Sequence, residues 1–457
     1  MKRRSFFKLA GLGTTAVLGG RWGRAAEAPA GPGMLNEPAR ELPVAGEADV
    51  IVCGAGPAGV AAAVAAARRG AKTQLIETHG CLGGIWTAGA LSWILDHSNK
   101  TGFMQELWSG LAARGARGLT SEGQGTNAYD VEAMKLLLEE LCAAAGVRIR
   151  LHTRVCAARK NPDGRLEHVV TESKSGREAW RGKIFVDCTG DGDLAAQAGC
   201  AFDLGHPETQ LTQPMSLMAL VAGLVPGEVG AYFHGEDKAA DWSSPKDKLR
   251  AEMERGGHSP SYAKPTLFHL HDDLFALMAN HEYEARGTSA DDVTRATLHA
   301  RRELNQLVDG LRGLGGVWKD LRLVVTAEQI GVREGRRIHG LYTVTADDLR
   351  EGRRHADAVC RATFGVDVHA TDPKKEKGIE RSGVRAKPYD IPLRALIARD
   401  VGGLMMAGRC ISGDFLAHAS YRVTGNSVAL GEAAGKVAAF AAKTNRLPQE
   451  VKPEEAG

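Results

Sequence analysis

Three glycines, Gly54, Gly56 and Gly59, follow an apolar run near the start of the chain. Glycine at the first position permits a tight turn. At the second it lets the backbone approach a pyrophosphate, and at the third it lets a helix lie close to a strand. Pro57 and Ala58 stand between the last two glycines, where the start of a helix would offer amide donors and partial positive charge to phosphates. These five residues predict a site for the phosphates of a dinucleotide.

The elements that must position these glycines stand on either side of them. Asp49–Cys53 reads as an apolar strand and Val60–Arg69 as an Ala-rich helix, which Gly70 closes. A second strand, Ala71–Glu77, ends in an acid. The carboxylate of Glu77 can accept both ribose hydroxyls of an adenosine half, and it argues against NADP because it would repel a 2′-phosphate. Strand, helix, strand and acid in this order predict a Rossmann-type unit.

A second glycine-rich loop, at 78–89, follows that acid directly. In an NAD site the backbone need not approach the cofactor again at this point. FAD continues past the pyrophosphate, so an FAD site does need a second close approach of the backbone. The loop also carries large apolar side chains, which do not suit a free surface loop. We therefore expect FAD as the cofactor, with Gly83, Gly84 and Thr87 among the residues that bind it.

The formal charge of +3 comes from the amino terminus, because residues 1–28 hold six Lys or Arg and one Glu and the rest of the chain carries −2. A body that is close to neutral has no broad cationic surface for nucleic acid. The eight cysteines are scattered without a CxxC pair. Their spacing indicates neither a zinc ribbon nor a dithiol centre.

Residues 1–28 resemble a twin-arginine export signal, with Arg3 and Arg4 ahead of an apolar stretch at 9–20. That stretch is too short to span a bilayer, which needs roughly 20 residues, and it suits the apolar core of a signal. We expect the twin-arginine translocase as a partner, a periplasmic or otherwise exported location, and no stable membrane span. Residues 29–47, rich in Pro, Gly and Glu, are expected to form a linker.

From about residue 48 to residue 442, the chain resembles FAD-dependent oxidoreductases of the glutathione-reductase superfamily. More narrowly, it resembles bacterial relatives of the flavin subunit of heterodisulfide reductase. The early glycine unit, a helix and strand at 129–152, a run at 184–193 and a late segment at 403–442 carry this resemblance. It implies an α/β, Rossmann-like FAD/NAD(P)-binding fold, discontinuous in sequence, with an inserted α+β substrate domain. The implied parts are 48–205 and 385–445 for FAD, 206–384 for the substrate side, and a tail at 446–457.

The resemblance also implies which later residues bind the cofactor. The run at 184–193 brings Thr189, Gly190 and Asp191 to the adenosine side, with Cys188 in place of the family's usual Ala. The late segment holds the ribityl and pyrimidine end of the flavin at a turn and at the start of a small-residue helix. Its implied ligands are Gly408, Arg409, Gly425, Asn426 and Ser427.

A more distant similarity to fumarate reductases and succinate dehydrogenases covers the His-x-x-x-Arg-x-x-Gly-Asn-Ser run that begins at His418. It implies that Arg422 binds a substrate anion and that His418 lies by the flavin and moves a proton. The alternative is that both residues brace the turn or contact FAD. Asp96, just after the second glycine-rich loop, is a further catalytic candidate on position alone.

The middle of the chain matches no dinucleotide pattern. Strands are expected at 214–221 and 319–330 and a helix at 291–311. The charges of Gly331–Ile338 either line the active site or form an ion-paired turn. A His-rich stretch at 269–273 lacks convincing ligand spacing, so we expect no metal.

Neither a second GxGxxG nor a redox cysteine pair is present, so the sequence does not indicate a separate NAD(P)H domain. We therefore predict hydride transfer between FAD and a small organic substrate, such as a carboxylate or hydroxyl compound, with an electron acceptor or donor that the sequence does not identify. Two alternatives remain. A tRNA-modifying flavoprotein is disfavoured by the export signal, and a non-catalytic flavin electron carrier is disfavoured by the large middle region.

Overall fold

The computed structural model describes residues 35, 37–120, 123, 125–233, 243–374, 377–380 and 382–457. Contacts divide the chain into two units, 1–42 and 43–457, and every described helix and strand belongs to the second. The predicted export signal at 1–28 lies outside the described residues, as do positions 29–34 and 36 of the predicted linker. The first strand starts at Val44, so the end of the expected linker belongs to the sheet.

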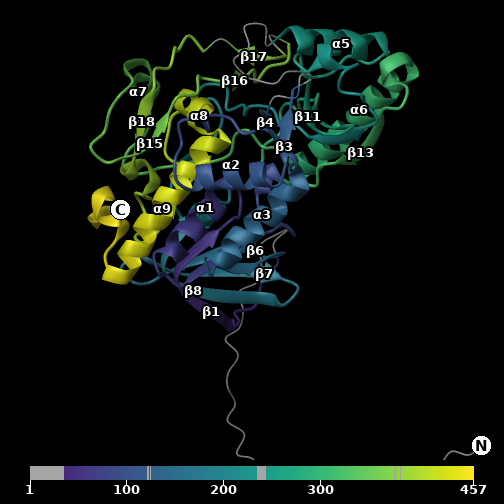
Figure 1. The fold of residues 1–457 in the computed structure, drawn as a ribbon. Helices are drawn as coiled ribbons and strands as arrows, with labels where there is room; N and C mark the ends of the chain where they lie inside the picture. The colour runs from purple at the N-terminus through teal and green to yellow at the C-terminus, as the bar shows by residue number, and fades with distance from the viewer. Residues whose placement is uncertain are drawn as a thin grey trace, which may run out of the picture. The chain divides into compact units, whose positions relative to one another are not determined.

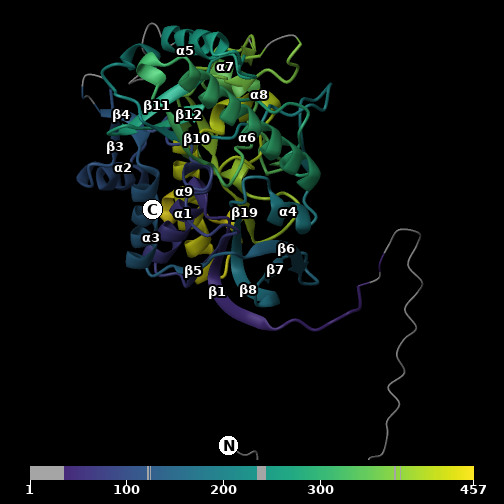
Figure 2. The ribbon, with the colours of Figure 1, turned by 90° about the vertical axis from the view of Figure 1, so that its right-hand side faces the viewer.

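A mostly parallel sheet lies at the lower end of this unit (Figures 1 and 2). Five parallel strands run in the order β5-β2-β1-β8-β19, and β7 and β6 extend the sheet antiparallel from β8. The late strand β19 pairs with the early strand β8, with Leu404 opposite Phe185. The bounds are β1 (Val44–Cys53), β2 (Thr73–Ile76), β5 (Arg148–Arg150), β6 (Arg154–Lys160), β7 (Leu166–Ser173), β8 (Gly176–Asp187) and β19 (Leu404–Met406). This arrangement confirms the predicted α/β, Rossmann-like and discontinuous fold.

Small residues let two helices, α1 (Pro57–Arg68) and α9 (Thr424–Thr444), lie close together beside the sheet (Figure 1, α9 in yellow). A Cβ at Gly431 or Gly435 would collide with a backbone carbonyl of α1. Glycine is therefore required at both positions for this approach. Helices α2 (Phe103–Ala113), α3 (Val131–Ala144) and α10 (Pro453–Ala456) contact this pair, whereas α4 (Asp193–Gln197) contacts β6 and β8 of the sheet.

A second, antiparallel sheet has the order β11-β12-β10-β13 and lies toward the upper end of the unit with α5 and α6 (Figure 2). Helix α6 buries one apolar stripe, including Ala296, Ala300 and Leu304, as its helical spacing predicts. The expected strand at 214–221 is wrong over its first residues, because Met215 and Ser216 form isolated bridges to loops instead. The bounds are β10 (Ala219–Ala222), β11 (Thr266–His271), β12 (Leu274–Met278), β13 (Arg322–Thr326), α5 (Ser244–Arg255) and α6 (Ala290–Gly313).

Short two-stranded antiparallel sheets and further helices complete the unit. The strand pairs are β3 (Arg117–Leu119) with β4 (Gly125–Tyr129), β9 (Phe202–Asp203) with β14 (Arg337–Ile338), β15 (Ala358–Ala362) with β18 (Tyr389–Pro392), and β16 (Val368–His369) with β17 (Ile379–Glu380). The remaining helices are α7 (Ala346–Glu351) and α8 (Phe415–Tyr421). Within the described residues, none of the helices has the length and apolar character to cross a membrane.

Two large buried apolar clusters underlie this arrangement. One surrounds the parallel sheet and includes residues from 338 onward. The other surrounds the antiparallel sheet, and Ala90, Trp93 and Ala128 from the early part of the chain join it. The early loop after the second glycine-rich segment therefore connects the two cores. The domain boundaries expected at 205 and 384 stay predictions, and β15 from the expected substrate side pairs with β18 from beyond it.

Candidate functional site

A cavity of about 410 Å³ lies at the carboxyl ends of the parallel strands. Gly54, Glu77, Cys188 and Ala407, each the first residue after a strand (β1, β2, β8 and β19), all line it. From β1 the chain builds the sheet first toward β2 and β5 and later toward β8 and β19, so the cavity lies where the strand order reverses. Ligands of open α/β sheets bind at this place.

The three glycines of the first loop have different surroundings. A Cβ at Gly54, where φ is +91°, would collide with the carbonyl of Cys188, and one at Gly59 would collide with the carbonyl of Gly54. At Gly56, by contrast, a Cβ would meet no protein atom within 4 Å, because this residue faces the cavity. The structure therefore gives Gly54 and Gly59 packing roles and leaves Gly56 open to a ligand. Pro57 and Ala58 also line the cavity.

The second glycine-rich loop lies against the first. The amide of Gly83 donates to the carbonyl of Ala55 at 2.7 Å, and a Cβ at Gly84 would lie 3.0 Å from the Cα of Gly56. Gly84 lines the cavity, whereas Gly83 and Thr87 do not. The hydroxyl of Thr87 donates to the carbonyl of Leu82 at 2.5 Å and so stabilises the loop itself.

Glu77 is held in place at the cavity wall by two backbone amides. Ala55 N donates to Glu77 Oε2 at 2.5 Å, and His79 N donates to Oε1 at 2.8 Å. Each carboxylate oxygen can accept a further hydrogen bond. The acid at the end of β2 is therefore oriented to receive hydroxyls of a ligand in the cavity.

The segment after β8 is braced by Asp187, a residue that sequence reasoning did not assign. This fully buried carboxylate accepts from Thr189 N at 3.0 Å, Thr189 Oγ1 at 2.7 Å and Ala195 N at 2.8 Å. Burial raises the pKa of Asp187 to about 6. The turn that it supports places Thr189, Gly190 and Asp191 on the cavity wall, where Asp191 Oδ1 pairs with Arg409 Nη2 at 3.0 Å.

Several buried polar atoms on or beside the cavity wall have no hydrogen-bond partner in the part of the chain that the structure describes. They are Arg409 Nη1, Arg422 Nε, Thr424 Oγ1, Gln329 Oε1 and Asn426 Nδ2. Buried polar atoms almost always have a partner, so these atoms point to a bound group that supplies one. Thr424 opens α9, whose amino end therefore faces the cavity with partial positive charge. The wall fits a ligand with phosphates and polar ring edges, such as FAD.

Some of the late residues that were predicted to bind the cofactor line the cavity, and others support the residues that do. Gly408 and Ser427 line the cavity with Arg409, whereas Gly425 and Asn426 do not. A Cβ at Gly425 would collide with the carbonyl of Leu95, so this glycine lets the start of α9 lie against the early loop.

The three catalytic candidates are not brought together in the cavity. Arg422 lines it, but His418 is fully buried behind it, and burial together with the charges of Arg337 and Arg422 lowers the pKa of His418 well below its usual value. Asp96 does not line the cavity either. Its carboxylate accepts from Thr363 N at 2.9 Å and pairs with Lys100 at 3.3 Å, so it braces two loops.

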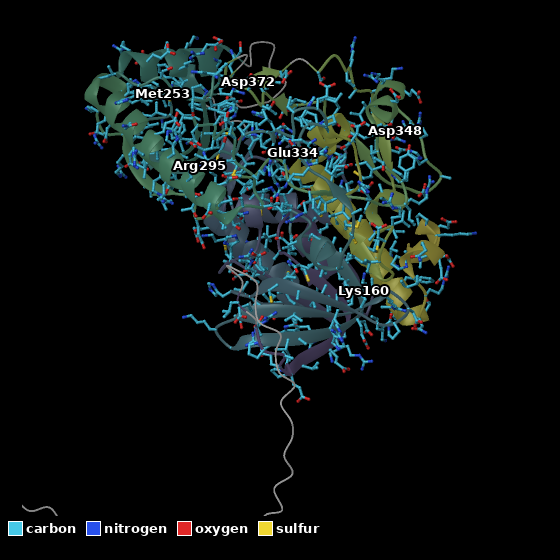
Figure 3. The ribbon with its side chains drawn as sticks, turned by 180° about the vertical axis from the view of Figure 1, so that it is seen from behind. Lys160, Met253, Arg295, Glu334, Asp348 and Asp372 are labelled. Carbon is cyan, nitrogen blue, oxygen red and sulfur yellow. The ribbon has the colours of Figure 1, made fainter. Side chains whose placement is uncertain are left out.

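The charged motif at 331–338 includes a residue that lines the cavity and residues that form an ion pair, so both interpretations that the sequence left open apply to part of it. Arg333 lines the cavity, whereas Glu334 and Arg337 form a buried ion pair at 2.5 Å. Figure 3 places Glu334 in the middle of the view, between Arg295 on α6 and Asp348 on α7. Sequence reasoning also missed the far wall, which Trp93, Ser216, Met218, Met278 and Gln329 form.

The His-rich stretch around β11 contacts the protein itself, with the ring of His269 bonded to the carbonyls of Leu119 and Asp272. Elsewhere in the described residues, Glu282, His299 and Glu303 place ligand-type atoms within 4.8 Å of one another. His299 already contacts both oxygens of Glu282 at 3.0 Å, and none of the three lines the cavity.

The fold and the cavity define an α/β dinucleotide-binding protein whose cofactor wall is built from early and late segments. Residues 49–456 match the FAD dependent oxidoreductase family, and the chain belongs to this family. The protein is therefore an FAD-dependent oxidoreductase, as its glycine loops predicted. No curated protein matches the sequence.

Several solved structures are similar to this chain at low sequence identity. A geranylgeranyl bacteriochlorophyll reductase-like protein from Thermoplasma acidophilum is 15% identical, with 90% of this chain and 82% of that chain covered and a TM-score of 0.45. The myxobacterial chondrochloren halogenase is 12% identical, covering 90% and 77%, with a TM-score of 0.45. The p-nitrophenol 4-monooxygenase of Pseudomonas putida is 13% identical, covering 65% and 70%, with a TM-score of 0.37.

Proposed function

We propose that this protein transfers a hydride between its FAD and a small organic substrate, and that it is exported already folded around the cofactor. FAD supplies the two-electron chemistry when it is bound. The observation that carries the proposal is the extent of the cavity, which runs from Glu77 on the dinucleotide side to Arg333 on the side of the second core.

The far wall has the composition of a small-molecule site. Leu91, Trp93, Leu95, Met218 and Met278 supply apolar surface. A few polar groups, such as Ser216 and Arg333, lie among them. Cavities that bind small molecules combine mainly apolar walls with a few placed polar groups. The far wall therefore supports a substrate that lies next to the cofactor and away from bulk water.

The chain's own residues contribute electrostatics in this proposal. The amino end of α9 faces the cavity and favours negative charge that develops there. Arg422, on the same wall, is paired with Asp367, and its Nε has no partner among the described residues, so it can donate a hydrogen bond to a ligand there. Because His418 is fully buried and does not line the cavity, we do not propose proton transfer by its ring.

Kinship with the glutathione-reductase superfamily and with the heterodisulfide reductase flavin subunit stays a prediction from the motifs. Export rests on the paired arginines at the amino terminus. The twin-arginine route carries folded proteins, and this property suits a chain that must acquire FAD before export. The electron partner is proposed only as an external acceptor or donor.

The proposed function is tested by anaerobic reduction of the FAD-loaded protein. A panel of carboxylates, hydroxy acids, alcohols and sugars is added, and the flavin absorbance near its visible maximum is followed. Bleaching by one class of compound, and recovery on admission of an oxidant, is the expected result. If no compound of the panel bleaches the flavin and only dithionite does, hydride transfer from a small organic donor is contradicted.

A further inference from the structure

We infer that the substrate is an organic monoanion, a carboxylate with an apolar body, and that Arg333 binds its anionic end. This inference rests on the proposed use of the cavity as a substrate site. It is carried by a half-buried guanidinium on the cavity wall that forms no ion pair within the described residues.

Arg333 donates only to neutral acceptors. Its Nη1 donates to the Pro214 carbonyl and to Ser216 Oγ, both at 2.8 Å, and its Nη2 lies 3.8 Å from the sulfur of Met278. No ion pair of Arg333 occurs in the described part of the chain. Burial and the nearby charge of Arg422 lower the pKa of Arg333 to about 10, so it remains protonated at neutral pH. A guanidinium that is partly withdrawn from water and has no ion-pair partner favours a counter-charge from a ligand.

The neighbouring charged groups are already paired. Asp367 contacts Arg422 Nη2 at 3.3 Å and His369 Nε2 at 3.3 Å, and Glu334 is paired with Arg337. Asp367 also acts on the charge of Arg333 from a greater distance. Two carboxylates therefore face three arginines, and this group of side chains carries one net positive charge.

The histidines beside these groups do not add to that charge. Burial and the charge of Arg333 lower the pKa of both His281 and His369, the latter to about 4. Both rings are therefore neutral near pH 7. A single negative charge on the ligand balances the site, which favours a carboxylate over a phosphate dianion.

The surroundings of Arg333 define the other end of the ligand. Met278 reaches toward its guanidinium, and Trp93 and Met218 line the same cavity. Thioether and indole surfaces suit an apolar or aromatic body and offer little to a polyhydroxylated sugar. Arg333 binding the carboxylate would leave that body against these side chains.

The test uses the FAD-loaded full chain and the flavin absorbance spectrum, which reports binding without turnover. Benzoate and hexanoate are titrated against their uncharged amides at constant ionic strength. We expect a saturable perturbation for the carboxylates, with Kd values at least about tenfold lower than for the amides, because an amide lacks the negative charge and the second acceptor oxygen that a guanidinium binds. Arg333→Met is expected to raise the carboxylate Kd by at least about tenfold, to change amide binding much less, and to leave FAD content unchanged.

Arg312→Met, which removes an exposed arginine from the end of α6, is the matched control and should bind like the wild type. Arg333→Lys keeps the positive charge but lacks the paired N–H donors of a guanidinium, so it should bind the carboxylates with intermediate affinity. If the Met variant does not fold, the carboxylate Kd of this Lys variant is the deciding measurement. Equal binding of acid and amide by the wild type, unchanged carboxylate binding in Arg333→Met, or loss of FAD from it would overturn the inference. Carboxylate binding without bleaching by any compound would support this inference and overturn hydride transfer.

Discussion

The Gly56→Val variant is expected to fold like the wild type and to lose FAD. A Cβ at Gly56 meets no protein atom within 4 Å, and φ there is −66°, a value that any residue adopts. The added side chain therefore costs the fold little, but it occupies the part of the cavity where a pyrophosphate would approach the first glycine loop. Loss of two charge-assisted bonds from backbone amides corresponds to about 3–6 kcal/mol, or about 10²–10⁴-fold in Kd.

The assay is a titration of the apo protein with FAD, followed by flavin fluorescence, together with thermal unfolding of the apo protein. Gly227→Val is the matched control, because a Cβ at this exposed glycine would also meet no atom within 4 Å and the residue does not line the cavity. Both apo variants should unfold within about 2 °C of the wild type, and only Gly56→Val should fail to bind FAD. Wild-type FAD affinity in Gly56→Val would refute the placement of the cofactor phosphates.

Three further outcomes follow from the structure. Because burial raises the pKa of Asp187 to about 6, its contribution to folding stability is present at low pH and is lost as pH rises from about 4 to about 6. The free energy of unfolding of Asp187→Asn, measured with urea, should therefore rise relative to that of the wild type by on the order of 3 kcal/mol between these pH values. A difference between the two proteins that does not change with pH would contradict this. Asp96→Asn should cost about 3–5 kcal/mol by leaving Lys100 buried and unpaired, with an unchanged rate of flavin reduction; a stable variant without turnover would restore Asp96 as a catalytic group. Replacing Arg3 and Arg4 by lysine should keep the protein in the cytoplasmic fraction, and undiminished export would exclude the twin-arginine route.

The geometry of the glycine loops could be predicted from the sequence because its requirements act on the backbone. Few residues other than glycine suit Gly54, where φ is +91° and a Cβ would collide with a carbonyl. Gly84, likewise, approaches Gly56 too closely for most side chains. The acid at the end of β2 could be predicted for the same reason, since the strand fixes where its carboxylate lies. Such constraints leave a local pattern that a single sequence displays.

The far wall of the cavity could not be predicted in this way, because it depends on which side chains turn toward the cavity. Asp96 and Leu95 are adjacent in sequence, yet Leu95 lines the cavity and Asp96 turns away to Thr363. Within the motif at 331–338, Arg333 faces the cavity while Glu334 is paired inside the protein. Composition could not separate these roles, since they are set by contacts between segments far apart in the chain.

A crystal structure of the FAD-loaded protein with benzoate would locate both ligands in one experiment. We expect the pyrophosphate beside Gly56 and the benzoate carboxylate within hydrogen-bond distance of Arg333, both in the cavity that these residues line. A cofactor bound away from the carboxyl ends of β1 and β8, or a benzoate carboxylate that contacts no arginine of this cavity, would contradict this expectation.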